Sequence, residues 1–387
     1  MKKTLLTLSI AAVFAVGASA AEFKAGTYTA QAPGIHGDVT VTVTLTKDKI
    51  TDVKVTHSET PGIGSKAAEL LPGRIVERQS PQVDGVTGAT ITSTAIRTAV
   101  ADTVKQAGAD PAALVPLAVK KQAKNETVDT DVVVVGGGGA GMSATIRTRM
   151  NGLNVVLVEK MPFIGGAASI SGGQVVAQGS KLQKAFGVTD DSVESMVKDF
   201  QANGHNLNDL SKLTLYAKNV GPTIDWLHDQ VGVKFIPNDL PFLAEYSHRR
   251  ALEFQGGAGT MAQHLREVIG SNGAKVLFNT RVEKLIVEDG KVTGVEAVDG
   301  NTGTKYTIRA KKTLLTTGGY GNNKNLLTDT YKNTLYYGPV SSTGDGLQMA
   351  QKLGVKTQLL EYGKRYPNGI EVAPGKAKST ILSLIHI

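Results

Sequence analysis

The chain has 387 residues, with 42 lysines and arginines against 34 aspartates and glutamates, and a formal net charge of +8. This length is enough for more than one domain, and the positive charges form no basic runs interleaved with aromatic residues, which argues against nucleic-acid binding. The sequence contains no cysteine, which excludes disulfides, thiolate-bound iron–sulfur clusters and C-x-x-C-H haem attachment. Any redox chemistry therefore has to rest on organic cofactors, and we assign no metal site.

Residues 1–20 have the pattern of a secretory signal peptide. Two lysines give a basic start, an apolar stretch runs from Leu5 to Val16, and Ala18-Ser-Ala20 matches a cleavage site. We expect cleavage after Ala20 and export, to a bacterial periplasm. An uncleaved anchor is the alternative, and it is disfavoured because the apolar stretch is short for a membrane span. We expect no later segment to cross a membrane.

Residues 38–46 alternate between apolar and hydroxyl side chains, which predicts a half-buried β-strand. The apolar side chains, from Val39 to Leu45, would face one side and the threonines the other. A Lys-Asp-Lys turn follows, and a second stretch with buried positions runs from Ile50 to Val55. We therefore expect a β-hairpin here.

Residues 83–93, Val-Asp-Gly-Val-Thr-Gly-Ala-Thr-Ile-Thr-Ser, are rich in small side chains directly before a predicted helix. Gly85, Gly88 and Ala89 leave room for a bulky group to approach the hydroxyl of Thr90. A phosphate held there would lie close to the positive end of the helix. The alternative is a capped turn with no cofactor.

Within this segment, Asp-Gly-Val-Thr-Gly-Ala-Thr at residues 84–90 resembles the flavinylation motif of FMN-binding domains. The resemblance implies a small α+β domain over residues 21–108, in which a flavin transferase links FMN to Thr90 through a phosphoester. Residues 109–129 contain proline, alanine and then lysines, and we predict that they form a solvated linker.

Residues 131–141, Asp-Val-Val-Val-Val-Gly-Gly-Gly-Gly-Ala-Gly, predict a buried parallel strand that turns into a helix. Gly136, Gly138 and Gly141 satisfy G-x-G-x-x-G, the pattern of dinucleotide-binding turns. A second apolar strand ends in Glu159, where an acid accepts hydrogen bonds from a ribose diol and repels a 2′-phosphate. FAD or NAD is therefore favoured over NADP, the alternative being an ordinary strand–helix turn.

Three later segments resemble the fumarate reductase and succinate dehydrogenase flavoprotein superfamily. They are Pro162–Gly173 with two glycine pairs, Lys312–Asn322 with Gly-Gly near its end, and Ser342–Ala350 with Thr-Gly-Asp-Gly. Together with the glycine turn they imply a Rossmann-type FAD-binding domain, which we place at residues 130–365. The resemblance implies FAD contacts from Gly136, Gly138, Ala140, Gly141, Glu159, Gly165, Gly166, Ala167, Ala168, Gly172, Gly173, Val282, Gly318, Gly319 and Asp345.

Ser247-His-Arg-Arg250 precedes a glycine-rich helix start, and the superfamily has a similar His-Arg segment. The resemblance suggests that Arg249 or Arg250 contacts a substrate anion or the FAD pyrophosphate. A structural salt bridge is the favoured alternative. Before this segment, residues 181–204 and 207–231 are predicted to form surface and packing helices.

The superfamily places its proton-donating arginine and its substrate-binding side chains in a capping domain and a returning C-terminal segment. We expect residues 366–387 to be the start of a truncated capping domain, and residues 382–387 resemble nothing in the superfamily. We therefore assign no catalytic residue to this chain and expect it to be inactive by itself.

These features predict an exported two-flavin oxidoreductase. Electrons would pass from an external donor, a cytochrome or a quinol-linked protein, through FMN on Thr90 and FAD to the C=C bond of a small α,β-unsaturated carboxylate such as fumarate or urocanate. Two alternatives stay open: a dehydrogenase or oxidase of the same superfamily, and a non-catalytic flavin electron carrier.

Overall fold

The computed structural model describes residues 22–117, 123–237, 240–363, 369–373 and 376–379. The predicted signal peptide and residues 382–387 lie outside this part of the chain. Two compact units are present: one takes in residues up to Ser58, Ala68–Gly85 and Ile91–Val119, and the other Glu59–Ala67, Val86–Thr90 and Lys120–Ile387. The predicted domain boundaries at residues 108, 129 and 365 stay predictions.

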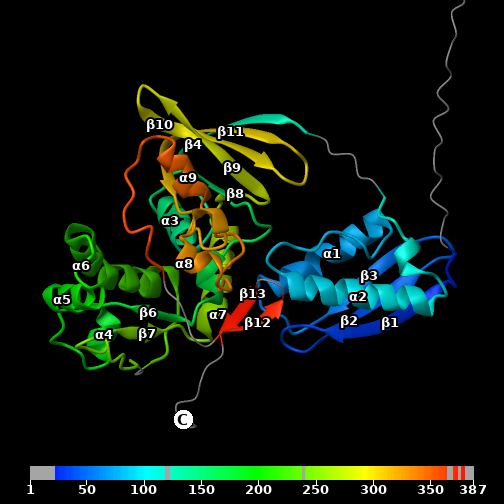
Figure 1. Cartoon of the computed structure of the whole chain (residues 1–387), viewed down its shortest axis with the longest axis horizontal. Helices are drawn as coiled ribbons and strands as arrows, with labels where there is room; N and C mark the ends of the chain where they lie inside the picture. The colour runs from blue at the N-terminus through cyan, green and yellow to red at the C-terminus, as the bar shows by residue number, and fades with distance from the viewer. Residues whose placement is uncertain (1–21, 118–122, 238–239, 364–368, 374–375, 380–387) are drawn as a thin grey trace, which may run out of the picture. The chain divides into compact units, whose positions relative to one another are not determined.

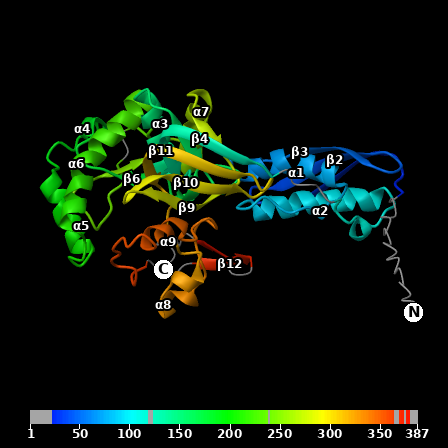
Figure 2. The same cartoon turned by 90° about the horizontal axis from the view of Figure 1, so that it is seen from above.

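The first unit is built on an antiparallel three-stranded sheet with two helices on one face (Figures 1 and 2). Its elements are β1 (Gly26–Pro33), β2 (Asp38–Leu45), β3 (Ile50–Thr56), α1 (Gly64–Arg78), α2 (Thr90–Gln106) and the short turn η1 (Pro111–Ala113). The backbone amide of Ile50 donates to Gln79 Oε1 at 2.8 Å, which ties the start of β3 to the end of α1. The expected α+β fold is confirmed.

The alternating pattern of β2 explains why this sheet has one buried face. Val39 and Val43 are fully buried, whereas the threonines between them are half-exposed. On the opposite face the hydroxyls of Thr29 and Thr42 lie 3.1 Å apart across the strands. The predicted hairpin is confirmed as β2 and β3. Strand β1 was not predicted, because Ala32 is its only buried residue and its sequence lacks an apolar alternation.

The second unit contains a six-stranded sheet in the order β8-β5-β4-β11-β10-β9. The strands are β4 (Asn125–Val135), β5 (Val155–Val158), β8 (Lys275–Leu277), β9 (Thr280–Glu288), β10 (Lys291–Asp299) and β11 (Lys305–Leu315). Strands β8, β5, β4 and β11 are parallel, and β10 and β9 continue the sheet as antiparallel strands. Helix α3 (Gly139–Met150) connects β4 to β5. This is the predicted Rossmann-type arrangement.

Strand β4 is apolar along its whole C-terminal half because both of its faces are covered. Val132 and Val134 pack with Met142 of α3 in one core. Val133 and Val135 face a second core, shared with the antiparallel strands and with a later helix. An uninterrupted run of valines is therefore what this position in the sheet requires.

The second unit also contains further helices and short strands (Figures 1 and 2). They are η2 (Gly166–Ile170), β6 (Gln174–Val176), α4 (Lys181–Ala185), α5 (Val193–Asn203), α6 (Leu210–Trp226), η3 (Leu227–Val231), β7 (Ala251–Glu253), α7 (Gly257–Ser271), η4 (Lys324–Leu326), α8 (Asp329–Lys332), α9 (Asp345–Gln351), β12 (Gly369–Ala373) and β13 (Lys376–Ser379). The helix predicted over residues 181–204 is wrong as a single element, because Gly187 adopts a φ of 91° and separates α4 from α5. No helix in the described part of the chain is long and apolar enough to span a membrane.

Candidate cofactor site

The glycine-rich turn between β4 and α3 is held by close backbone packing. Gly136 has a φ of 101°, and a Cβ at this position would lie 2.6 Å from the carbonyl oxygen of Thr316. A Cβ at Gly141 would lie 1.9 Å from the carbonyl oxygen of Gly136. The Thr316 hydroxyl donates to that same Gly136 oxygen at 2.7 Å. Side chains are excluded at both glycines by the protein itself.

Gly138 differs from these two glycines. It caps the N-terminus of α3 with a φ of −71°, which any residue can adopt, and a Cβ there would meet nothing within 4 Å. Gly138 also lines a pocket at the carboxyl ends of the parallel strands. A side chain would enter that pocket, so the missing Cβ keeps space for a ligand against the helix N-terminus.

The pocket joins segments that are far apart in the sequence. The predicted contact residues that line it are Gly136, Gly138, Ala140, Glu159, Gly166, Ala167, Ala168, Val282, Gly318, Gly319 and Asp345. Gly141 and Gly165 pack beneath it, and the backbone amide of Gly165 donates to the carbonyl oxygen of Gly137 at 2.7 Å. Gly172, Gly173 and Thr90 are not among the residues that line it. The cofactor contacts themselves stay predictions.

Glu159 is buried at the end of β5 and faces the glycine turn. One carboxylate oxygen accepts the backbone N–H of Gly137 at 2.7 Å, and the other accepts that of Met161 at 2.8 Å. Burial raises the pKa of the Glu159 carboxyl, and these two hydrogen bonds only partly oppose that effect. The carboxylate therefore shapes the turn as well as lining the pocket, and its predicted bond to a ribose diol stays a prediction.

Two cations at this pocket were missed by the sequence reasoning. Lys160 Nζ donates to Asp345 Oδ2 at 2.8 Å and to Thr343 Oγ1 at 2.6 Å. Arg281 Nη2 donates to Asp345 Oδ1 at 2.7 Å. Burial acts to raise the pKa of the Asp345 carboxyl, but the hydrogen bond and charge of Lys160 lower it below its usual value. The only sequence signal was position, since Lys160 follows Glu159 and Arg281 precedes Val282.

The second glycine pair of the Pro162–Gly173 segment, Gly172-Gly173, is held in place by the short sheet β6–β7. The backbone amide of Phe254 donates to the carbonyl oxygen of Gly173 at 2.9 Å. Gly173 has a φ of 85°, and a Cβ there would lie 3.1 Å from the amide nitrogen of Ala258 at the start of α7. Gly172 is open, with nothing within 4 Å of an added Cβ. This loop is therefore rigidly placed in the second unit, outside the pocket.

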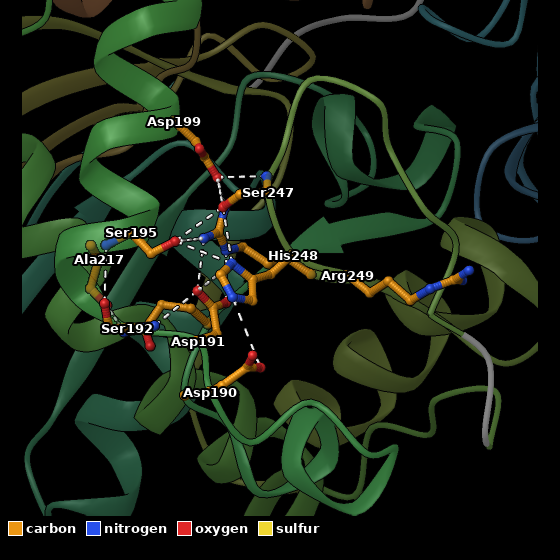
Figure 3. Close-up of polar contacts among 12 residues, drawn as sticks. Asp190, Asp191, Ser192, Ser195, Asp199, Ala217, Ser247, His248 and Arg249 are labelled. Carbon is orange, nitrogen blue, oxygen red and sulfur yellow. Dashed lines mark hydrogen bonds and ion pairs between the residues drawn. The ribbon is translucent and has the colours of Figure 1, made fainter.

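Arg250, directly before β7, is a structural residue. Its guanidinium is fully buried and pairs with Asp191 and Asp199, while Ser195 accepts a further bond. Figure 3 labels these three partners. Arg249 points away from this cluster in Figure 3 and donates to the carbonyl oxygen of Leu240 at 2.7 Å. The favoured salt-bridge interpretation is thus correct for Arg250.

Thr90 is the first residue of the 17-residue helix α2 and is exposed. The turn before it is closed by the backbone amide of Ala89, which donates to the carbonyl oxygen of Val86 at 2.9 Å. Gly88 has a φ of 87°, and a Cβ at Gly85 would lie 3.1 Å from Ser93. The local geometry therefore places Thr90 as an exposed residue at a helix N-terminus. Attachment of FMN at its hydroxyl stays a prediction.

Comparison with known proteins identifies both flavin modules. Residues 131–375 match the FAD binding domain family, and residues 34–105 match the FMN-binding domain family. The chain belongs to the FAD binding domain family. It also carries an FMN-binding domain. The predicted superfamily and the two predicted flavins are thereby confirmed at the level of these domains.

The chain is similar to several curated reductases. Urocanate reductase of Eggerthella lenta is 33% identical over 360 residues, covering 90% of this chain and 59% of that protein. NADH:acrylate oxidoreductase of Vibrio harveyi is 28% identical and covers 90% of this chain and 41% of that protein. Among solved structures, the open conformation of a flavocytochrome c3 fumarate reductase is 34% identical with a TM-score of 0.55, covering 58% of this chain and 40% of that one. This chain therefore spans between two fifths and three fifths of these relatives.

The pocket residues fit FAD. The open position at Gly138 lets a diphosphate approach the N-terminus of α3, and the buried acid Glu159 stands where a ribose diol is bound in such folds. Lys160 and Arg281 line the same pocket and supply positive charge. FAD, when bound, supplies hydride and electron transfer, and the protein supplies the binding and orientation.

Proposed function

We propose that the protein is a flavin-dependent reductase that acts on the C=C bond of a small α,β-unsaturated carboxylate. One observation carries the proposal: an FMN-binding domain and an FAD pocket occur in one chain that is similar to urocanate reductase over 90% of its length. In this proposal FMN attached to Thr90 is the entry point for electrons, and the pocket at Gly138 holds the FAD that serves the substrate.

The proposal includes what we infer about export and partners. The signal pattern of residues 1–20 supports export to a periplasm, where a cytochrome or a quinol-linked protein would donate electrons. A flavin transferase would attach FMN to Thr90. We assign no side chain of this chain to protonation of the substrate, and we propose that residues 1–387 alone bind flavin without turnover.

Reduction assays on two proteins test this proposal. One is the chain of 387 residues, and the other carries in addition the region that the urocanate reductase relative has beyond the match. Each is supplied with reduced methyl viologen and with fumarate, urocanate or acrylate, and viologen oxidation is followed by absorbance. We expect turnover only in the longer protein and with at least one of these acids. Turnover by the 387-residue chain would contradict its proposed inactivity.

The same two proteins can be used to test the alternative that the protein is a dehydrogenase. A 3-ketosteroid-Δ4-(5α)-dehydrogenase from Rhodococcus jostii RHA1 is 26% identical with a TM-score of 0.52 and covers 62% of this chain. Oxidation of a saturated substrate by the longer protein with an artificial acceptor, in the absence of any carboxylate reduction, would replace the reductase proposal with this alternative. A longer protein that exchanges electrons but acts on neither class would be a flavin electron carrier.

A further inference from the structure

Three side chains from separate elements meet in the FAD pocket, at the carboxylate of Asp345. Asp345 begins α9, Lys160 follows β5, and Arg281 lies at the start of β9. All three side chains line the pocket. Their sequence separations of 185 and 64 residues mean that only the folded chain brings them together.

Each carboxylate oxygen of Asp345 contacts a different cation. Oδ2 accepts Lys160 Nζ at 2.8 Å, and Oδ1 accepts Arg281 Nη2 at 2.7 Å and the Thr343 hydroxyl at 3.0 Å. Only 11% of the Asp345 side chain is exposed, against 24% for Lys160 and 58% for Arg281. The anion is therefore enclosed, while the cations reach toward open space.

Both cations keep hydrogen-bonding capacity for a ligand. An ammonium group has three donors, and Lys160 uses two of them on Asp345 and Thr343. A guanidinium has five donors, and Arg281 makes one hydrogen bond, to Asp345, within the described chain. The group of three residues, Lys160, Arg281 and Asp345, carries a net charge of +1.

The net positive charge of this group matters because FAD brings a diphosphate with two negative charges. Without Lys160 and Arg281 the pocket would present only the carboxyls of Glu159 and Asp345 to that dianion, and like charges at short range are strongly unfavourable where water is partly excluded. We infer that Lys160 and Arg281 bind the diphosphate side of FAD electrostatically, and that Asp345 is the positioning residue that holds both cations in place. This inference rests on the proposed use of the pocket for FAD.

Titration of FAD into the full chain tests the inference without relying on turnover. FAD is removed with a chaotropic salt and added back, and binding is followed by the quenching of its fluorescence. We expect Lys160→Met to raise the dissociation constant about tenfold or more, because it removes a positive charge that contacts the diphosphate. Asp345→Asn should raise it about fivefold, because it removes the carboxylate that holds Lys160 and Arg281 in place. Lys160→Arg keeps the charge and should restore affinity to within about threefold of the wild type.

Lys284→Met is the matched control. Lys284 lies on β9 with Arg281 but outside the pocket, is 67% exposed and pairs only with Glu296, at 3.6 Å, within the described chain. This variant removes the same charge from the same strand, so its FAD affinity should be unchanged. Equal affinities of Lys160→Met and Lys284→Met would overturn the inference.

The wild-type chain provides a measurement that does not depend on folding of any variant. If charge pairing with the diphosphate contributes to binding, the dissociation constant for FAD should rise about fivefold between about 50 mM and about 500 mM salt. An affinity that is independent of salt would refute the inference even if Lys160→Met fails to fold. Absence of FAD binding by the wild type would instead refute the proposed function.

Discussion

Arg250 and Asp191 form a two-armed ion pair that is closed to solvent. Arg250 Nε lies 2.7 Å from Asp191 Oδ2, and Nη2 lies 2.7 Å from Oδ1, with 0% and 2% of the two side chains exposed. Asp199 accepts Nη1 of the same guanidinium at 2.6 Å. Because Arg250 directly precedes β7, this pair anchors the strand that continues to Phe254 and holds the Gly173 loop.

The first prediction concerns the loss of this buried cation. Arg250→Met would leave the carboxylates of Asp191 and Asp199 without the buried cation that they share, which costs about 3–5 kcal/mol of unfolding free energy. Arg249→Met is the control, since Arg249 is exposed and should cost less than about 1 kcal/mol. Urea unfolding followed by fluorescence of Trp226, the single tryptophan, on α6, measures both. Equal losses in the two variants would show that burial of the ion pair is unimportant.

The second prediction is a loss of stability in acid. Burial acts to raise the pKa of Asp191, but hydrogen bonds from Arg250 and Gln183 hold it below its ordinary value, and the pKa of Asp199 is lowered in a similar environment. A carboxyl with a lowered folded-state pKa contributes stability that is complete above its unfolded pKa, about 3.9, and is lost as the pH falls through the folded value.

Unfolding free energies measured from about pH 5 down to about pH 2.5 check this sign. The wild type should lose stability over this range, and Asp191→Asn should show a smaller slope from a lower starting value. Asp190→Asn changes a neighbouring carboxyl that is 83% exposed, so its acid slope should match that of the wild type. A steeper slope in Asp191→Asn than in the wild type would contradict the assignment.

A third prediction separates glycines that serve packing from a glycine that serves the ligand. A Cβ at Gly141 would clash with the backbone of Gly136, so Gly141→Ala should cost about 1–3 kcal/mol of stability. A Cβ at Gly138 meets no protein atom, so Gly138→Ala should leave the unfolding free energy within about 0.5 kcal/mol of the wild type.

The FAD affinities of the same two variants complete this comparison. Gly138→Ala places a methyl group in the pocket and should raise the dissociation constant for FAD at least about tenfold, because close backbone approach is lost. Calorimetry or fluorescence titration gives the affinity, and thermal melting of the apoprotein gives the stability. A stable Gly138→Ala variant that binds FAD normally would show that the ligand lies elsewhere.

Local patterns predicted the parts of the fold that depend on near neighbours. The alternation from Val39 to Leu45 predicted β2, because a strand with one buried face needs that period. The valines of β4 and the glycines after them predicted the strand–turn–helix, since both the buried strand and the tight turn restrict side chains locally.

Contacts over long sequence separations could not be predicted in this way. Lys160 and Arg281 have ordinary sequence contexts, and nothing local indicates that both bind Asp345. The partner of Arg250 was likewise unknown, although a salt bridge was the favoured interpretation. Charged side chains acquire such roles only when folding brings together elements far apart in the sequence, here the end of β5, the start of β9 and the start of α9.

The fourth prediction concerns Thr90, an exposed residue at the start of α2. If FMN is joined to its hydroxyl oxygen through a phosphoester, the denatured chain should keep a yellow fluorescence on a gel when it is produced together with a flavin transferase. Thr90→Val has nearly the same shape and no hydroxyl, so it should lose all of this fluorescence, whereas Thr90→Ser keeps an attachable oxygen and should retain part of it. Thr98→Val, at an exposed threonine of the same helix outside the motif, is the control and should label like the wild type. Fluorescence that persists in Thr90→Val would place the flavin on another residue.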